Sequence, residues 1–264
     1  MLGLEQRLRN AGKSSPLTHL ESRPPLVEAE AIQRAILLAK STGVRLHIAH
    51  LSSKEGVDLV CRAKSEGVPI SAETALHYLL LSTADYRRLG SIIKINPPVR
   101  TKHDCCQLWQ GIHDGTVDIL ATDHSPHSLE EKKTDNIWDA LSGFAGVETQ
   151  LPLMLTQINK GKLTLSQYVG LSSEKPAKIF GIYPRKGAVQ IGSDCDIVIV
   201  ELKKKWRLRS EDLHSKTKVT PFDGWRVQGL VTHTILRGQV IMEHGEIVKY
   251  GEGRLVRLLR GGQF

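Results

Sequence analysis

Acidic and imidazole side chains follow a short apolar segment in the stretch Ile119–His127, which reads Ile-Leu-Ala-Thr-Asp-His-Ser-Pro-His. The apolar residues predict a buried strand, and Asp123, His124 and His127 then lie in the loop after it. A parallel α/β barrel places its active site at the carboxyl ends of its strands. A carboxylate and an imidazole there are suited to binding a metal ion or transferring protons. A helix cap or a turn is the alternative interpretation of an isolated Asp-His pair.

A second stretch of the same kind lies upstream. Val44–Ser53 is a short apolar segment that ends in His50 and continues with small hydroxyl residues. We expect His50 and Asp123 to meet at one edge of a parallel sheet. For His50, a hydrogen-bonded core histidine is the alternative. His47 comes three residues earlier, and because side chains alternate along a strand, we expect it to point into the layer of helices.

The elements that would position these residues alternate between helix and strand. Apolar periodicity predicts helices over residues 26–41, 54–65, 83–89, 101–114, 147–159 and 165–180, and strands over 44–49, 68–74 and 117–122. This alternation is typical of parallel βα units. Beyond residue 181 the pattern changes to short strands between glycine-containing turns, predicted over 188–200, 229–237 and 239–248. We therefore predict an irregular N-terminal segment over 1–23, a barrel portion over 24–183 and a β-rich portion over 184–264.

Four motifs recur in the order in which the cyclic amidohydrolases carry them. They are His-Leu-Ser-Ser at 50–53, Glu-Thr-Ala-Leu-His-Tyr at 73–78, Asn-Pro-Pro-Val-Arg at 96–100 and Thr-Asp-His-Ser-Pro at 122–126. The sequence thus resembles this family, which includes allantoinases, dihydroorotases and hydantoinases. The segments 22–32 and 220–224 look most like allantoinase. Ala75 and Leu76 replace the family's usual Cys-Pro before His77, so we interpret that stretch as packing.

The resemblance implies a site with two zinc ions bridged by hydroxide. His50 matches a metal ligand on the family's sixth barrel strand. Asp123 matches the aspartate of the eighth strand, which is both a metal ligand and the catalytic general base. Asn96 and His127 match loop positions where the family binds the ring amide of its substrate, and a structural turn is the alternative for each. His124 is expected to make a supporting hydrogen bond.

The resemblance also implies an incomplete barrel. A closed (β/α)8 barrel needs eight strands and about 250 residues, whereas residues 24–181 hold three or four βα units. We expect an α/β fold made of the last strands of a partial (β/α)8 amidohydrolase barrel, with a small C-terminal β-sandwich portion. The family's His-X-His pair does not occur among the 11 histidines. On this basis the chain corresponds to the C-terminal part of such an enzyme.

Composition restricts the other classes of function. The net charge of +8 permits a nucleic-acid partner, but neither of the basic runs 203–209 and 254–260 has enough interleaved aromatics to stack on bases, so we expect none. No stretch approaches the roughly 18 apolar residues of a membrane span, and the N-terminus has no secretory pattern. The cysteines form no CxxC motif and predict free thiols in a reducing compartment, so we expect a cytoplasmic protein.

The expected function is that of a metal-dependent cyclic amidohydrolase of the allantoinase type. It would hydrolyse the ring amide of allantoin to allantoate in purine catabolism, with Zn²⁺ as cofactor and a small cyclic ureide as substrate. We expect the 264-residue chain itself to be inactive, and the full-length form to be a homo-oligomer. One alternative is a dihydroorotase or hydantoinase. An alternative of another class is a non-catalytic isoform or remnant that acts only by association.

Overall fold

A computed structural model describes residues 2–257 of the chain. The chain divides into two compact units, which we call unit 1 (Met1–Glu148 with Arg209–Asp223) and unit 2 (Thr149–Leu208 with Gly224–Phe264). The predicted boundary near residue 183 lies within unit 2. The division into a barrel portion and a β-rich portion stays a prediction. None of the helices in the described part of the chain has the length and apolar character needed to cross a bilayer.

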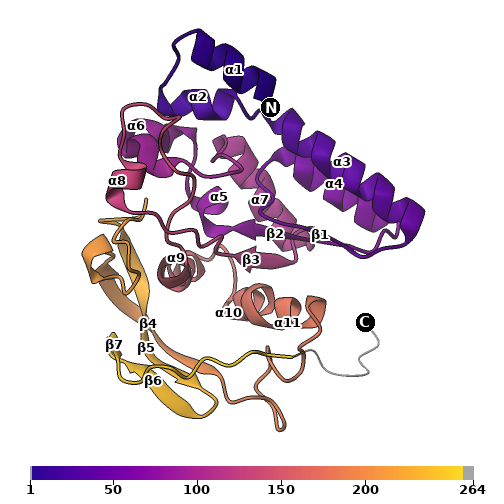
Figure 1. Ribbon diagram of the computed structural model, residues 1–264. Helices are drawn as coiled ribbons and strands as arrows, with labels where there is room; N and C mark the ends of the chain where they lie inside the picture. The colour runs from indigo at the N-terminus through magenta and orange to yellow at the C-terminus, as the bar shows by residue number, and fades with distance from the viewer. Residues whose placement is uncertain (1, 258–264) are drawn as a thin grey trace. The chain divides into compact units, whose positions relative to one another are not determined.

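Unit 1 contains a three-stranded parallel sheet (Figure 1). Its strands, in spatial as well as chain order, are β1 (Leu46–Ile48), β2 (Ile70–Ala75) and β3 (Ile119–Ala121). The register pairs Ile48 with Ala72 and Ala75 with Ala121. The parallel βα arrangement predicted from the alternation of elements is confirmed. Because the strands are parallel and adjacent, their carboxyl ends share one edge of the sheet.

Three long helices accompany this sheet, and α3 and α4 lie side by side in Figure 1. They are α3 (Pro25–Thr42), α4 (Lys54–Ser65) and α7 (Lys102–Asp114). Each terminus has a local cause. The Ser53 side chain accepts a hydrogen bond from the backbone of Gly56 and caps α4, Thr101 and Asp104 form a capping box on α7, and α3 ends at Gly43 with φ of 70°.

The first residues form helices, which corrects the expectation of an irregular segment over 1–23. These helices are α1 (Leu2–Asn10) and α2 (Pro16–Glu21). The anchor is His19, which is fully buried and whose Nε2 lies 3.1 Å from the carbonyl oxygen of Ile95. Arg23 also pairs with Glu5 at 3.2 Å. Because these anchoring groups are polar, the segment lacks the apolar periodicity that would have revealed its helices.

Short helices complete unit 1. They are α5 (Leu76–Leu80), η1 (Thr83–Asp85), α6 (Tyr86–Leu89), η2 (Gly90–Ile93), α8 (Leu129–Lys132) and η4 (Ser210–Asp212). Unit 2 holds the helical elements α9 (Val147–Asn159), α10 (Leu165–Val169), η3 (Gly170–Glu174) and α11 (Lys175–Ile179). The helix predicted over 165–180 is therefore present as three consecutive segments.

The strands of unit 2 form one antiparallel sheet in the order β4-β5-β6-β7, and the limits 184–264 of the β-rich portion stay a prediction. They are β4 (Ile197–Arg207), β5 (Arg226–Leu236), β6 (Gln239–Glu243) and β7 (Glu246–Ile247). The first strand begins nine residues later than predicted, because residues 184–196 form a loop held by ion pairs of Arg185 and Lys186 with Asp194. A sandwich needs a second facing sheet, and residues 2–257 contribute only this one to unit 2.

Candidate functional site

His50 lies just beyond the carboxyl end of β1 and has a left-handed backbone, with φ of 41°. The following residue holds it there: the backbone N–H of Leu51 donates to the Glu73 carbonyl at 2.7 Å, and the Leu51 carbonyl accepts from the Thr74 hydroxyl at 2.7 Å. A left-handed backbone is uncommon for a residue with a side chain, and it persists only where the surroundings enforce it. The Leu51 contacts to β2 provide that constraint.

Asp123 occupies the equivalent position two residues after the end of β3, and its φ is 46°. The loop around it packs tightly: the backbone N–H of Ser125 donates to the Phe144 carbonyl at 3.2 Å. A methyl group in place of the Gly146 hydrogen would come within 2.7 Å of the Thr122 carbonyl oxygen. Both predicted metal ligands therefore leave the edge of the same sheet on strained backbone, as side chains at functional sites often do.

The two side chains influence each other electrostatically. Burial raises the pKa of the Asp123 carboxyl, the His50 imidazole opposes that rise, and Glu73 adds to it. Within residues 2–257 neither the His50 imidazole nor the Asp123 carboxylate has a hydrogen-bond partner. Both side chains are partly exposed and free of hydrogen bonds to the described residues. An imidazole and a carboxylate close enough to interact fit a divalent metal ion that takes nitrogen and oxygen ligands.

A buried polar network supports the loop after His50. The Arg100 guanidinium is 4% exposed, and it donates to Glu28 Oε2 at 2.8 Å and to Ser52 Oγ at 2.9 Å. Glu28 in turn accepts from the backbone N–H of Ser52 at 2.8 Å. Glu28 comes from α3 and Arg100 precedes α7, so the network ties two helices to the carboxyl end of β1. Such supporting contacts orient a metal ligand.

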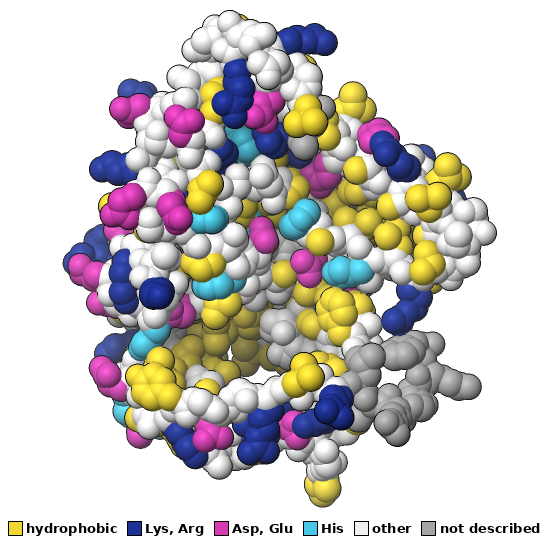
Figure 2. Space-filling view, viewed as in Figure 1, with side chains coloured by type: hydrophobic (Ala, Val, Ile, Leu, Met, Phe, Trp, Pro, Cys, Tyr) yellow, Lys and Arg dark blue, Asp and Glu magenta, His cyan; other side chains and the backbone are white. Residues whose placement is uncertain are grey.

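A cavity of about 460 Å³ opens beside His50. Asn96 and Arg100 contribute to its polar wall, and Ala31 and Ile48 to its apolar wall. Figure 2 shows histidine and acidic side chains close together over the region where Figure 1 places the three strands. The cavity has the size of a small-ligand site. Asp123 is not among its lining residues, so the structure brings Asn96 to the same cavity as His50 and does not bring Asp123 there.

The predicted loop residues have protein partners of their own. His127 Nε2 lies 3.2 Å from the Ser142 carbonyl oxygen, and its Nδ1 lies 3.5 Å from the Glu131 carboxylate. His124 Nδ1 accepts hydrogen bonds from the backbone of Gly146 and Val147 at 3.1 and 3.2 Å. His124 therefore makes a supporting contact of the expected kind at the start of α9. The substrate contacts predicted for His127 and Asn96 stay predictions.

His47 does not point into the layer of helices as expected. Its ring nitrogens lie 2.8 Å from Ser71 Oγ and 3.3 Å from Glu73 Oε2, both on β2. Ile48, the next residue, lines the cavity beside α3, so His47 lies on the opposite face of the strand. The expectation assumed that side chains alternate regularly from His47 to His50. The left-handed backbone of His50 interrupts this alternation.

Of three buried residues near the site, only His77 belonged to a sequence motif, and Lys94 and Lys132 carried no signal in the sequence. His77 is fully buried, neither of its ring nitrogens has a hydrogen-bond partner among residues 2–257, and burial lowers its pKa to about 3. It packs against Tyr78 and Phe144, as expected for a packing residue. The Lys132 ammonium is also buried and donates to the carbonyls of Lys94 and Leu141 at 2.7 and 2.9 Å. Lys94 likewise binds three carbonyls of the segment 137–140.

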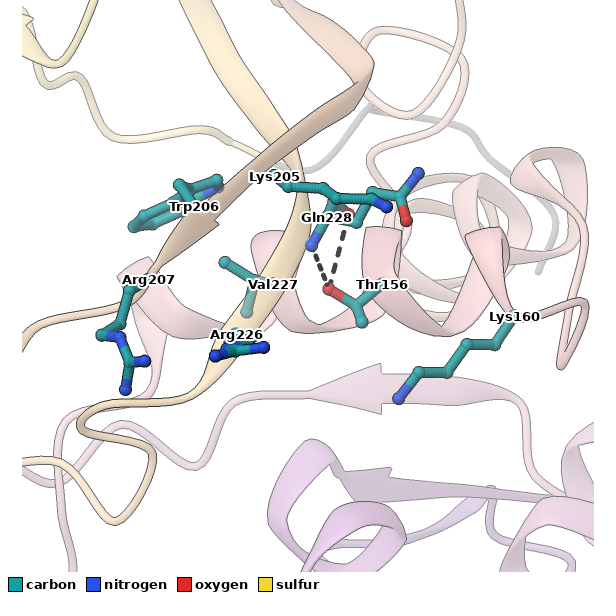
Figure 3. Close-up of a pocket in the computed structure, with 8 residues that line it drawn as sticks. All are labelled: Thr156, Lys160, Lys205, Trp206, Arg207, Arg226, Val227 and Gln228. Atoms are coloured by element: carbon teal, nitrogen blue, oxygen red, sulfur yellow. Dashed lines mark hydrogen bonds between the residues drawn. The ribbon is translucent and has the colours of Figure 1, made fainter.

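Unit 2 contains a second cavity, of about 470 Å³, shown in Figure 3. Its basic lining residues come from the turn that follows α9, at residue 160, and from β4 and β5; they are Lys160, Lys205, Arg207 and Arg226. Thr156 and Gln228 are joined by a hydrogen bond from the Gln228 backbone N–H to the Thr156 hydroxyl at 2.9 Å. The wall contains neither imidazole nor carboxylate. It therefore lacks the groups that metal-assisted hydrolysis requires.

Comparison with known proteins identifies the family. The sequence model of the amidohydrolase family matches residues 5–241. The chain is 40% identical over 257 residues to an L-hydantoinase of Paenarthrobacter aurescens, covering 96% of this chain and 56% of that protein. It is 37% identical to an allantoinase of Solibacter usitatus, with coverage of 96% and 56%. It is 38% identical to a dihydroorotase of Pyrococcus horikoshii, with coverage of 91% and 54%.

A solved structure gives the same result. The L-hydantoinase from Arthrobacter aurescens superimposes with a TM-score of 0.91 at 40% identity, over 94% of this chain and 56% of that one. The chain thus spans about half the length of the relatives it matches. Three different enzyme names at 37–40% identity support the family and do not distinguish allantoinase from the other two.

Proposed function

Because the chain belongs to the amidohydrolase family, we propose that unit 1 carries part of a site that hydrolyses the ring amide of a small cyclic ureide. The observation that carries this proposal is the shared geometry of His50 and Asp123. Both follow strands of one parallel sheet, both have a left-handed backbone, and neither has a hydrogen-bond partner in the described part of the chain. A satisfied core histidine or a helix-capping aspartate would have such partners.

The chemistry follows from the two residue types. His50 and Asp123 would hold a zinc ion, which when bound supplies hydroxide at neutral pH by lowering the pKa of water. Burial raises the pKa of Asp123. That shift brings its carboxyl closer to the range in which a group can take a proton and return it to the departing ring nitrogen. Asn96 would donate to a ring carbonyl, and its position in the wall of the cavity beside His50 supports this role.

Allantoin is the substrate that we propose first, with hydrolysis to allantoate as the reaction. The segments 22–32 and 220–224, which resemble allantoinase, support it. A hydantoin or dihydroorotate is the second candidate, since an L-hydantoinase and a dihydroorotase are 40% and 38% identical to this chain. We also propose a cytoplasmic location, supported by four free cysteines, and a homo-oligomeric full-length form.

We further propose that the 264-residue chain alone is inactive. A site with two zinc ions needs about six ligands, and His50 and Asp123 supply two. The family's His-X-His pair has no counterpart in this sequence. Unit 1 also leaves both edges of its three-stranded sheet unpaired by other strands of the described chain, whereas a closed barrel has no edges. This same observation favours the alternative that the chain acts only through association with another protein.

The experiment joins this chain to the part of the P. aurescens L-hydantoinase that it does not match, which we propose to be that protein's N-terminal part. The isolated chain and the hybrid are assayed with allantoin, hydantoin and dihydroorotate, together with bound zinc. We expect no turnover by the isolated chain and zinc-dependent hydrolysis by the hybrid. The rate should fall at least about 100-fold in His50→Asn and Asp123→Asn variants. His103→Asn, at an exposed position on α7, is the matched control.

The outcomes separate the hypotheses. Hydrolysis by the hybrid that survives Asp123→Asn would refute the assigned site. A folded hybrid that binds zinc and hydrolyses none of the three substrates would refute the proposed reaction class. Turnover by the isolated chain with stoichiometric zinc would refute only its inactivity.

A further inference from the structure

A second cluster of ligand-type side chains lies in unit 2, on the sheet β4-β5-β6-β7. It consists of His233 on β5, Glu243 at the end of β6 and His244 in the turn that follows. One nitrogen of each imidazole and one carboxylate oxygen all lie within 4.8 Å of one another. These residues belong to a different unit from His50 and Asp123, and the proposed hydrolytic site makes no use of them.

The sheet register brings the three residues together. His233 and Glu243 are direct partners in the antiparallel ladder of β5 and β6, so their side chains lie on the same face. His244 and Gly245 form the two-residue turn into β7, with φ of 49° and 91°, the left-handed pattern of a tight hairpin. The backbone N–H of His244 donates to the Thr232 carbonyl at 2.7 Å, which fixes the turn beside His233.

The distances approach those of a zinc site. His233 Nε2 lies 3.3 Å from Glu243 Oε1. Zinc bonds to nitrogen and oxygen are about 2.0–2.1 Å long, so two ligand atoms of a tetrahedral site are about 3.3 Å apart. The His233 and His244 rings meet edge to face with centroids 5.1 Å apart. His244 is exposed and able to rotate the remaining distance toward a common ion.

The surroundings favour a cation. His233 Nδ1 lies 3.1 Å from the Thr232 hydroxyl, a contact that orients the ring and leaves Nε2 for a ligand. Glu246 is the direct ladder partner of Glu243, so a second carboxylate lies on the same face of the sheet. Two imidazoles and a carboxylate suit zinc or copper, whereas magnesium and calcium prefer oxygen ligands alone. Three protein ligands leave the fourth position for water.

We propose that His233, Glu243 and His244 form a surface site for a divalent transition-metal ion, Zn²⁺ in the first place. A simple ion pair is the competing explanation, and it requires only His233 and Glu243. The two explanations differ at His244, which binds the ion in the metal site and takes no part in the ion pair. Metal binding would join the β6–β7 turn to β5 and so stabilise this corner of the sheet, since an ion that binds only the folded state adds to stability.

The test uses the 264-residue chain after treatment with a chelator. Zn²⁺ is titrated in competition with a chromophoric chelator, and the imidazole nitrogens are followed by long-range ¹H–¹⁵N NMR. We expect zinc to shift the ring nitrogens of both His233 and His244. Removing a contact that only orients a ligand typically weakens metal binding about 10–100-fold, so loss of a ligand in His244→Asn or Glu243→Gln should cost at least about 100-fold.

The variants keep the fold and separate the two zinc sites. Asn tolerates the left-handed backbone of residue 244, and circular dichroism checks that each variant is folded. His103→Asn on α7 is the matched control, and His50→Asn removes the zinc ligand of unit 1. Equal zinc affinity of His244→Asn and the unaltered chain at the unit 2 site would overturn the proposal. So would a zinc-induced shift at His233 without one at His244.

Discussion

At the scale of single residues, His50 and Asp123 combine a side chain that can bind a metal ion with an unfavourable backbone. Both have positive φ, a conformation that costs of order 1 kcal/mol or more for a residue with a side chain. In the described part of the chain, neither side chain makes a hydrogen bond that would offset this cost. This combination is the reason for assigning them to a ligand rather than to the core.

Replacing His50 should therefore leave the fold intact. We expect His50→Asn to keep or raise the free energy of unfolding, by up to about 1 kcal/mol, because Asn accepts the left-handed backbone more readily. The same variant should lose zinc binding in unit 1. Urea unfolding of the metal-free chain measures the first effect, with Leu51→Ala as a core control that should cost about 2–5 kcal/mol. A loss of more than 1 kcal/mol in His50→Asn would identify His50 as a structural residue.

His19 should make stability depend on pH. Burial lowers its pKa to about 4, the contact with the Ile95 carbonyl and the charge of Glu5 oppose that shift, and the charges of Arg23 and Lys94 add to it. The unfolded chain then binds more protons than the folded one between pH 4 and pH 6.5. The free energy of unfolding should consequently rise with pH across this window, by up to about 3 kcal/mol from this residue.

The His19→Gln variant isolates this contribution. Gln keeps an N–H donor for the Ile95 carbonyl and does not titrate. The measurement is urea unfolding of both proteins from pH 4 to pH 7, and the difference between their curves removes the titration of the carboxylates. If the two curves run parallel over this range, His19 is not the residue responsible.

At the scale of elements, the buried ion pair of Arg100 with Glu28 joins α3 to the segment that precedes α7. Removing one charge leaves the other buried without a partner, so Arg100→Met should cost about 3–5 kcal/mol. The double variant Arg100→Met with Glu28→Leu should regain much of that loss. Chemical unfolding of the four proteins in this cycle gives the coupling energy. A loss in the double variant equal to the sum of the two single losses would show that the pair is not coupled.

The elements of unit 1 were largely predictable from the sequence. Helix α4 has the predicted limits, and β1, β2 and β3 lie within or close to their predicted ranges. Alternating apolar segments and capping residues such as Ser53 are local signals, so a single sequence contains them. Strand β4 was displaced because the ion pairs of residues 185–196, which hold that stretch as a loop, depend on contacts that local patterns do not report.

The site was predictable only where a motif marked it. His50 and Asp123 came from strand ends and family motifs, and the structure places both at the same edge of one sheet. The Glu28–Arg100 network, the cap formed by His124 and the buried Lys132 join residues about 20 to 70 positions apart. No local pattern encodes such pairs. His47 was misplaced because the left-handed backbone of His50 cannot be seen in the sequence.

At the scale of the whole molecule, one surface feature favours association between copies of the chain and another opposes it. Strand β4 has a neighbour on one side only among the described strands, and its Val198 and Ile199 side chains are 47% and 45% exposed. The first part of β4, residues 197–200, is apolar, and an exposed apolar edge is a template for pairing with another chain. The lysines at 203–205 oppose pairing over the second part of the strand. The net charge of +8 opposes association through repulsion between copies.

The salt concentration should determine how far the chain associates. The Debye length falls from about 30 Å at 0.01 M to about 3 Å at 1 M ionic strength, so added NaCl weakens the repulsion and leaves the apolar edge unaffected. We expect sedimentation velocity to show a larger associated fraction at 0.5 M than at 0.02 M NaCl. Ile199→Lys should lower that fraction at both salt concentrations. Leu38→Lys is the matched control, because it adds the same charge at an exposed position on helix α3.

The control separates two causes of association. If β4 pairs with a second chain, a lysine at Ile199 acts both through its charge and through loss of the apolar contact, whereas a lysine at Leu38 acts through charge alone. The difference between the two variants should therefore persist at 0.5 M NaCl, where the charge effect is screened. Identical behaviour of the two variants at high salt would place the contact elsewhere. A chain that stays monomeric under all these conditions would show that β4 does not pair at all.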